Sequence, residues 1–239
     1  MGKLNRDWTV GPHGPLERLE EGLVTVTGEI AMPLGRFPRR MTAVTLSEGR
    51  LAVWSPIPLR EEGMAALEAL GRIAFLIVPG PHHRLDIAAW HARYPDAAVL
   101  CPRGARGAVR EVVPTCDVED VMGAHDVRFS TVPGTRSQEG ALEIRRAGHF
   151  TLVLNDVIAN VRHPRGIGAQ VMARLFGFGV SHPQVPRAVR RALVGSPQVL
   201  AEALEDWAVA DLVRIVPSHG DIIDHDPAGA LRRAARSLR

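Results

Sequence analysis

The feature that most constrains this fold is a series of short, wholly apolar runs, each followed by polar residues. Ile73–Val78 is such a run, and a continuous apolar segment of strand length is typical of a strand buried on both faces. Just before it, apolar residues recur at helical spacing at Met64, Leu67 and Leu70, and a helix is expected after it over about Leu85–Arg93. This alternation predicts βαβ units and therefore an α/β fold.

The segment before this alternation is predicted to be β-structure. Leu23–Ile30 and Met41–Leu46 are rich in β-branched residues, and a turn at 47–50 leads into Leu51–Trp54. The sheet is expected to stop at Ser55-Pro56-Ile57-Pro58, because proline cannot occupy a central ladder.

The rest of the chain continues the pattern. Further strands are predicted at Ala97–Cys101, Asp126–Val132, Leu142–Arg146, Phe150–Val157 and Leu212–Val216. Further helices are predicted at about Ala105–Val112, from Pro197 and from Pro227. No repeat or linker interrupts the sequence, so we predict a single domain over 1–239, with an N-terminal extension at 1–22 and a helical insertion at 160–210.

Composition narrows the function classes. The 239 residues are 46% apolar, which allows a substantial core and argues against disorder. A formal charge of only +3 gives no basis for nucleic-acid binding, and no apolar run reaches membrane-spanning length. Cys101 and Cys116 do not form a disulfide framework. We expect a cytoplasmic protein with a small-molecule substrate, and the oligomeric state is left open.

Polar side chains follow three of the apolar runs. In open α/β sheets ligand sites form at the carboxyl ends of strands, so these segments are expected to converge. Imidazole and carboxylate suit Zn²⁺, Fe²⁺ or Mn²⁺. The candidate metal ligands are His82, His83, Asp86, Asp156 and His219.

Each candidate residue can also have an ordinary structural role that involves no metal. His82 and His83 can be turn residues bonded to backbone, and Asp86 can be a helix-start residue favoured by the helix dipole. Asp156 is harder to explain in this way, since a buried carboxylate is unfavourable without a partner or a metal. His219 before a glycine can be a turn residue, although the apolar strand before it favours a pocket position.

Taken in order, these motifs resemble the metallo-β-lactamase superfamily, and most closely an uncharacterised branch of it. The resemblance rests on the His-rich turn after a strand, Asn155-Asp156, Ser218-His219-Gly220, the Ser55–Leu59 turn, Trp90 and Tyr94–Ala97. It implies an αββα sandwich, in which two mixed β-sheets are flanked by helices. In that superfamily a His-x-His-x-Asp-His turn, a lone His, a bridging Asp and a late His bind one or two metal ions between the sheets.

The metal motif is incomplete here. If His82 takes the first position of the turn, Asp86 matches its Asp, and Arg84 and Ile87 stand where two histidines are usual. If the register is shifted so that His83 matches the second His, Asp86 matches the last, and both registers remain open. Thr135 follows the Pro-Gly where the lone His is usual, and Glu139 is a possible substitute. The resemblance therefore implies one divalent metal, with zinc expected and iron or manganese as alternatives.

The implied activity is metal-dependent hydrolysis of an ester, lactone or phosphoester by a metal-bound hydroxide. Asp86 would bind the metal or hold the attacking water. Whichever of His82 and His83 does not bind the metal, for example His83, would orient a neighbouring ligand. Arg84 would bind an anionic substrate. Phe176 and Phe178 are candidates to line the pocket. The alternatives are a metal-poor relative that binds a small ligand or partner, and an iron-dependent oxidoreductase on the same fold.

Overall fold

The computed structural model describes residues 4–32, 35–117, 122–164 and 166–239. Residues 1–3 of the predicted N-terminal extension and Arg165 of the predicted helical insertion lie outside the described residues. All positions predicted to carry chemistry lie within the described part of the chain.

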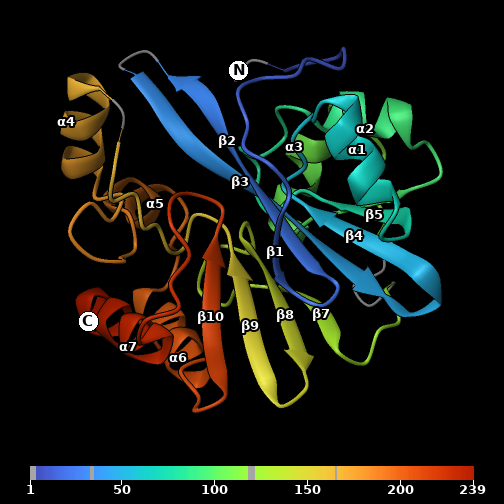
Figure 1. The fold of residues 1–239 in the computed structure, drawn as a ribbon. Coiled ribbons are helices and arrows are strands. Elements are labelled where there is room, and N and C mark those ends of the chain that lie inside the picture. Colours follow the sequence, from blue (N-terminus) through green and yellow to red (C-terminus); the bar gives the residue numbers. More distant parts are fainter. Residues whose placement is uncertain (1–3, 33–34, 118–121, 165) are drawn as a thin grey trace.

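Two mixed β-sheets form the centre of the fold (Figure 1). The first has the order β1-β2-β3-β4-β5-β6, antiparallel as far as β4 and parallel from β4 to β6. Its strands are β1 (Glu17–Glu20), β2 (Leu23–Met32), β3 (Gly35–Leu46), β4 (Arg50–Trp54), β5 (Arg72–Ile77) and β6 (Ala98–Leu100).

The second sheet has the order β10-β9-β8-β7, with β9 and β10 parallel and the other pairs antiparallel. Its strands are β7 (Val127–Thr131), β8 (Gly140–Arg146), β9 (His149–Leu154) and β10 (Leu212–Pro217). Because β9 and β10 run in parallel, their carboxyl ends lie at the same edge of this sheet.

Helices cover the outer face of each sheet, with α1–α3 on one side of Figure 1 and α6 and α7 on the other. Two more helices, α4 and α5, lie beside the β2–β3 ribbon end of the sandwich. The bounds are α1 (Glu61–Glu68), α2 (Ile87–Arg93), α3 (Arg106–Arg110), α4 (Ile167–Phe176), α5 (Arg187–Ala192), α6 (Pro197–Asp206) and α7 (Pro227–Leu238). Short 3-10 turns lie at Ser47–Gly49 and Arg103–Ala105.

None of the helices in the described ranges is both long enough and apolar enough to cross a bilayer.

The core of the described residues consists of three apolar layers and a smaller cluster around Phe37, Val161 and Ala173. On β4, Leu51 and Val53 pack toward α1–α3, whereas Ala52 and Trp54 pack between the two sheets. This alternation follows the two-residue period of a strand whose two faces are both buried. The third layer joins the second sheet to α6 and α7. The predicted αββα sandwich of two mixed sheets is therefore confirmed.

Two strand boundaries differ from the sequence-based prediction in a way that matters for the site. β9 ends at Leu154 rather than continuing to Val157, so Asn155 and Asp156 lie in the turn that follows the strand. The backbone N–H of Asp156 donates to the buried Glu139 carboxylate (3.0 Å) instead of to a neighbouring strand. At this point a side-chain carboxylate therefore takes the place of the backbone carbonyl that would accept this hydrogen bond in a β-ladder.

The second difference is that β3 begins at Gly35 and not at Met41. Pro38 and several arginines hide the strand pattern in this segment. Among the described strands, β4 pairs with β3 only through Thr42–Leu46, so no strand pairs with the earlier half of β3 on that side. The loop after β10 lies there instead, and the backbone N–H of Arg40 donates to the Ser218 carbonyl at 2.8 Å. Proline is tolerated at such an edge.

Candidate metal centre

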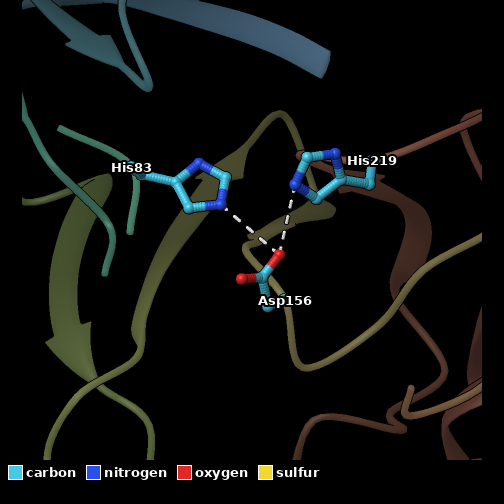
Figure 2. A group of neighbouring side chains, drawn as sticks. All are labelled: His83, Asp156 and His219. Atoms are coloured by element: carbon cyan, nitrogen blue, oxygen red, sulfur yellow. Dashed lines mark hydrogen bonds and ion pairs between the residues drawn. The ribbon is translucent and has the colours of Figure 1, made fainter. Parts of the chain in front are cut away.

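Three strand ends bring His83, Asp156 and His219 together (Figure 2). His83 follows β5, Asp156 follows β9 and His219 follows β10. The Nε2 atoms of His83 and His219 lie 3.4 Å and 3.3 Å from Asp156 Oδ1. One potential ligand atom from each residue lies within 4.8 Å of the other two. The convergence predicted for the carboxyl ends of the apolar strands therefore holds for these three side chains.

His219 is held by the neighbouring end of β3. Its Nδ1 lies 2.7 Å from the carbonyl oxygen of Pro38, which can only accept a hydrogen bond, so Nδ1 carries the proton. The buried Arg40 donates from Nη2 to the Gly220 carbonyl (3.0 Å), which fixes the loop after β10. Gly220 has φ +98°, and a Cβ there would lie 2.2 Å from the Asn160 carbonyl oxygen, so glycine is required.

His83 lies in the turn after β5. Its backbone N–H donates to the Gly80 carbonyl (3.1 Å), and its Nδ1 lies 3.3 Å from the Ser55 hydroxyl oxygen. Ser55 follows β4, and it has a positive φ of 50°. The two contacts orient the imidazole so that Nε2 faces Asp156.

Beneath Asp156 lies a buried carboxyl group. Glu139 Oε2 accepts hydrogen bonds from Asn155 Nδ2 and from the backbone N–H of Asp156, both at 3.0 Å. A Cβ at Gly80 would come within 2.7 Å of Glu139 Oε1, so only glycine leaves room for this carboxyl. The sequence suggested Glu139 as a substitute ligand, whereas in the structure it holds the turn that carries Asp156.

The electrostatics of the cluster follow from burial and mutual charge. Burial raises the pKa of Asp156, but the charges and hydrogen bonds of His83 and His219 outweigh this and hold the pKa well below its ordinary value. Burial lowers the pKa of His219, but the hydrogen bond to Asp156, the negative charge of Asp156 and the bond to Pro38 together outweigh this and raise the pKa. Burial, and then the negative charge of Asp156, raises the pKa of Glu139 well above its ordinary value.

The donor set fits a divalent metal ion. With the proton of His219 on Nδ1, a neutral imidazole presents the lone pair of Nε2 to Asp156 Oδ1 at 3.3 Å. Two acceptors at this distance repel each other unless a proton or a cation lies between them. Two imidazole nitrogens and one carboxylate oxygen are a ligand set suited to zinc, iron or manganese, and the Nδ1–H bond to Pro38 is the kind of outer contact that orients a ligating histidine.

The other predicted site residues lie outside this cluster. His82 lines the same cavity but is not one of the three grouped ligands. Asp86 is buried, and it accepts a hydrogen bond from Asn5 Nδ2 at 2.7 Å and forms an ion pair with Arg39. Arg84 contacts the Ala108 carbonyl and Glu111 and does not line the cavity.

Arg39 is a charged residue of the cavity that sequence reasoning missed. It lies on β3, lines the cavity and pairs with Asp86, which is distant in the sequence. The only local signal was a set of arginines in a segment that flanks apolar strands. Of the two aromatic residues proposed for the pocket, Phe178 lines this cavity, and Phe176 lies against a separate hollow beside α5.

The cluster opens into a cavity of about 390 Å³ between the β2–β3 ribbon and α5. Ring contacts link its wall to the cluster, since Phe37 lies 5.9 Å from His219 and 4.7 Å from Phe178, measured between ring centroids. The apolar residues of the wall that matter below are Ile30, Phe37, Phe178, Val189 and Leu193.

The arrangement of two mixed sheets between helices is the metallo-β-lactamase fold, which confirms the fold that the sequence resemblance implied. One similar solved structure is the metallo-β-lactamase FIM-1 from Pseudomonas aeruginosa in its mono-zinc form. The match has a TM-score of 0.62 and 13% identity, over 95% of this chain and 96% of that chain. Another is TMB-1, with a TM-score of 0.63 and 11% identity, over 95% of this chain and 99% of that chain. No protein-family model matches the sequence, and no curated protein matches it.

Proposed function

We propose that this protein is a metal-dependent hydrolase that holds one divalent metal ion, preferably zinc, through His83, Asp156 and His219. The observation that carries the proposal is the convergence of one ligand atom from each of these residues within 4.8 Å at the wall of a cavity. The fold shared with FIM-1, a metallo-β-lactamase described in a mono-zinc form, supports a single-ion site.

The bound ion would act as a Lewis acid that activates a water molecule and polarises the oxygen of the scissile group. The chain's own residues supply the positioning. Asp156 faces both imidazoles, Pro38 fixes the ring of His219, and Glu139 holds the backbone of Asp156. The apolar wall formed by residues such as Leu193 limits the access of bulk water.

This proposal leaves Asp86, His82 and Arg84 outside the ligand set. Asp86 already has two partners, Arg39 and Asn5, and a carboxylate with both oxygens engaged is a poor ligand. His82 remains a candidate for contact with a small-molecule substrate, because it lines the cavity. For Arg84, the contact with Glu111 favours a role in holding the turn, rather than in binding substrate.

The test is the metal content of purified protein after reconstitution with zinc, measured by inductively coupled plasma mass spectrometry. We expect about one ion per chain in the wild type, as in a mononuclear site, and loss of the ion in Asp156→Ala and His219→Ala. The matched control is His82→Ala, which removes a neighbouring imidazole from the cavity wall and is expected to keep the ion. Absence of metal from the wild type would reject the hydrolase and favour a ligand-binding protein on this fold.

A further inference from the structure

We infer that the cavity selects an uncharged, apolar carboxylic ester or lactone, and not a phosphoester. This inference rests on the proposed hydrolase function and names its substrate class. The first argument is the wall. The residues that line the cavity include Ile30 from β2, Phe37 from β3, Phe178 from the loop after α4, and Val189 and Leu193 of the α5 segment.

The second argument is size and continuity. A cavity of about 390 Å³ is at the small end of the range for small-molecule sites, about 300–1,000 Å³. The edge contacts from Phe178 to Phe37 and from Phe37 to His219 mean that the apolar wall begins directly beside the cluster. A short acyl or aryl group therefore contacts apolar side chains while its carbonyl faces the cluster.

The third argument is charge. Arg39 is the arginine among the described residues that line the cavity, and it is paired with Asp86. The side chains of Arg39 and Asp86 are only 12% and 1% exposed, and Asn5 completes the carboxylate's bonds. The positive charge of Arg39 is thus already balanced. The arginine predicted to bind an anionic substrate, Arg84, points to Glu111 instead.

These observations separate the uncharged esters and lactones from the phosphoesters. A phosphomonoester carries nearly two negative charges at neutral pH. Beyond the metal ion, the arginine of the cavity is already paired and much of the wall is apolar, so burying this charge is unfavourable. An uncharged ester loses little hydration on entering. Each buried methylene of its acyl group adds roughly fourfold to binding until the cavity is full.

The reaction is a simple hydrolysis and balances without a redox partner. The acyl carbon–oxygen bond of the ester breaks, and a new bond forms between the acyl carbon and the oxygen of water. One proton of the water ends on the released alcohol, and the other is lost to solvent as the carboxylic acid ionises.

The primary test is binding, because it does not depend on turnover. Benzylacetone, an uncharged ketone with the shape of a small ester, and phenyl phosphate are titrated by calorimetry into the metal-free and the zinc-loaded protein. For the metal-free protein we expect benzylacetone to bind at least about tenfold more tightly. Tighter binding of phenyl phosphate to the metal-free protein would overturn the inference without affecting the proposed metal site.

A cavity-filling variant tests whether benzylacetone binds in this cavity. Ala188 on α5 lines the cavity and is half-buried, so Ala188→Leu is expected to weaken benzylacetone binding by about tenfold or more. The matched control is Ala66→Leu on the exposed face of α1, which is expected to leave binding unchanged. Equal affinities in both variants would mean that the ketone binds elsewhere, and would overturn the inference.

Turnover by the zinc-loaded enzyme provides the second readout. We expect hydrolysis of para-nitrophenyl butyrate, with kcat/KM exceeding that for para-nitrophenyl phosphate, and a selective loss of the butyrate activity in Ala188→Leu. Preference for the phosphate would contradict the substrate class alone. If the protein binds no metal but still binds benzylacetone in this cavity, the proposed hydrolase function is rejected. The inference that the cavity selects uncharged, apolar ligands then still holds.

Discussion

At the scale of single residues, Glu139 is the most unusual group of the site. Its side chain is fully buried, Oε2 accepts two hydrogen bonds, and Oε1 has no partner among the described residues. Asp156 lies directly above it and is ionised, which makes a second negative charge unfavourable. The protonated form of Glu139 meets these constraints, because it keeps the Oε2 acceptor and carries no charge.

Substitution of Glu139 tests this reading. Glu139→Gln keeps an acceptor oxygen and is neutral like the protonated carboxyl, so we expect little change in the free energy of unfolding at a pH below the ordinary carboxyl pKa of 4.5. Glu139→Ala leaves Asn155 and the backbone of Asp156 without their acceptor, and the expected loss is about 3 kcal/mol. Chemical denaturation of the metal-free proteins measures both values. Equal losses in the two variants would show that the acceptor oxygen kept by glutamine does not stabilise the turn.

The same group predicts a pH dependence with a definite sign. A carboxyl whose pKa is raised on folding binds more protons in the folded than in the unfolded state, so stability falls as pH rises. The contribution of Glu139 is fully present below its ordinary pKa of 4.5 and is lost as pH rises from there toward the raised folded value. Relative to Glu139→Gln, the metal-free wild type should therefore lose stability as the pH rises above 4.5 toward the raised pKa of the folded state. A constant difference between the two proteins would contradict a raised pKa.

At the scale of elements, the position of the site could be predicted from the sequence, whereas the residues that hold its ligands in place could not. The apolar runs that end before His83 and His219 identify two of the three strand ends correctly, because continuous apolar strands are buried and their carboxyl ends converge. The choice between His82 and His83 depends on the turn geometry after β5, which the spacing of residues leaves open. Arg39 was missed because its partner, Asp86, is brought to it only by the tertiary fold.

The turn after β10 illustrates how one glycine positions a ligand. Gly220→Ala places a Cβ 2.2 Å from the Asn160 carbonyl and strains a backbone with φ +98°. We expect a loss of about 2–4 kcal/mol of stability and, since His219 is adjacent, zinc affinity lower by about tenfold or more. Gly49→Ala is the control, because Gly49 also has a positive φ but a Cβ there has open space around it. It should cost about 1 kcal/mol and leave zinc binding unchanged.

At the scale of the whole molecule, the candidate centre joins the two halves of the sandwich. His83 belongs to the first sheet, whereas Asp156 and His219 follow strands of the second. Direct bonds between the halves already exist nearby, since Trp54 donates from Nε1 to the Ser218 hydroxyl at 3.0 Å. A metal ion bound by all three ligands adds a further link between the sheets, and binding to the folded state alone raises its stability.

Zinc should therefore stabilise the protein as a unit, and it should do so through His83. At a free zinc concentration about 100 times Kd, the free energy of unfolding should rise by about 2.7 kcal/mol. Hydrogen exchange should slow at the ends of both β5 and β10. In His83→Ala the remaining ligands, Asp156 and His219, both follow strands of one sheet, so zinc should bind weakly and exchange at the end of β5 should no longer respond. His82→Ala should respond as the wild type does. If zinc stabilises His83→Ala as strongly as it stabilises the wild type, the ion is bound within the second sheet and does not link the two halves.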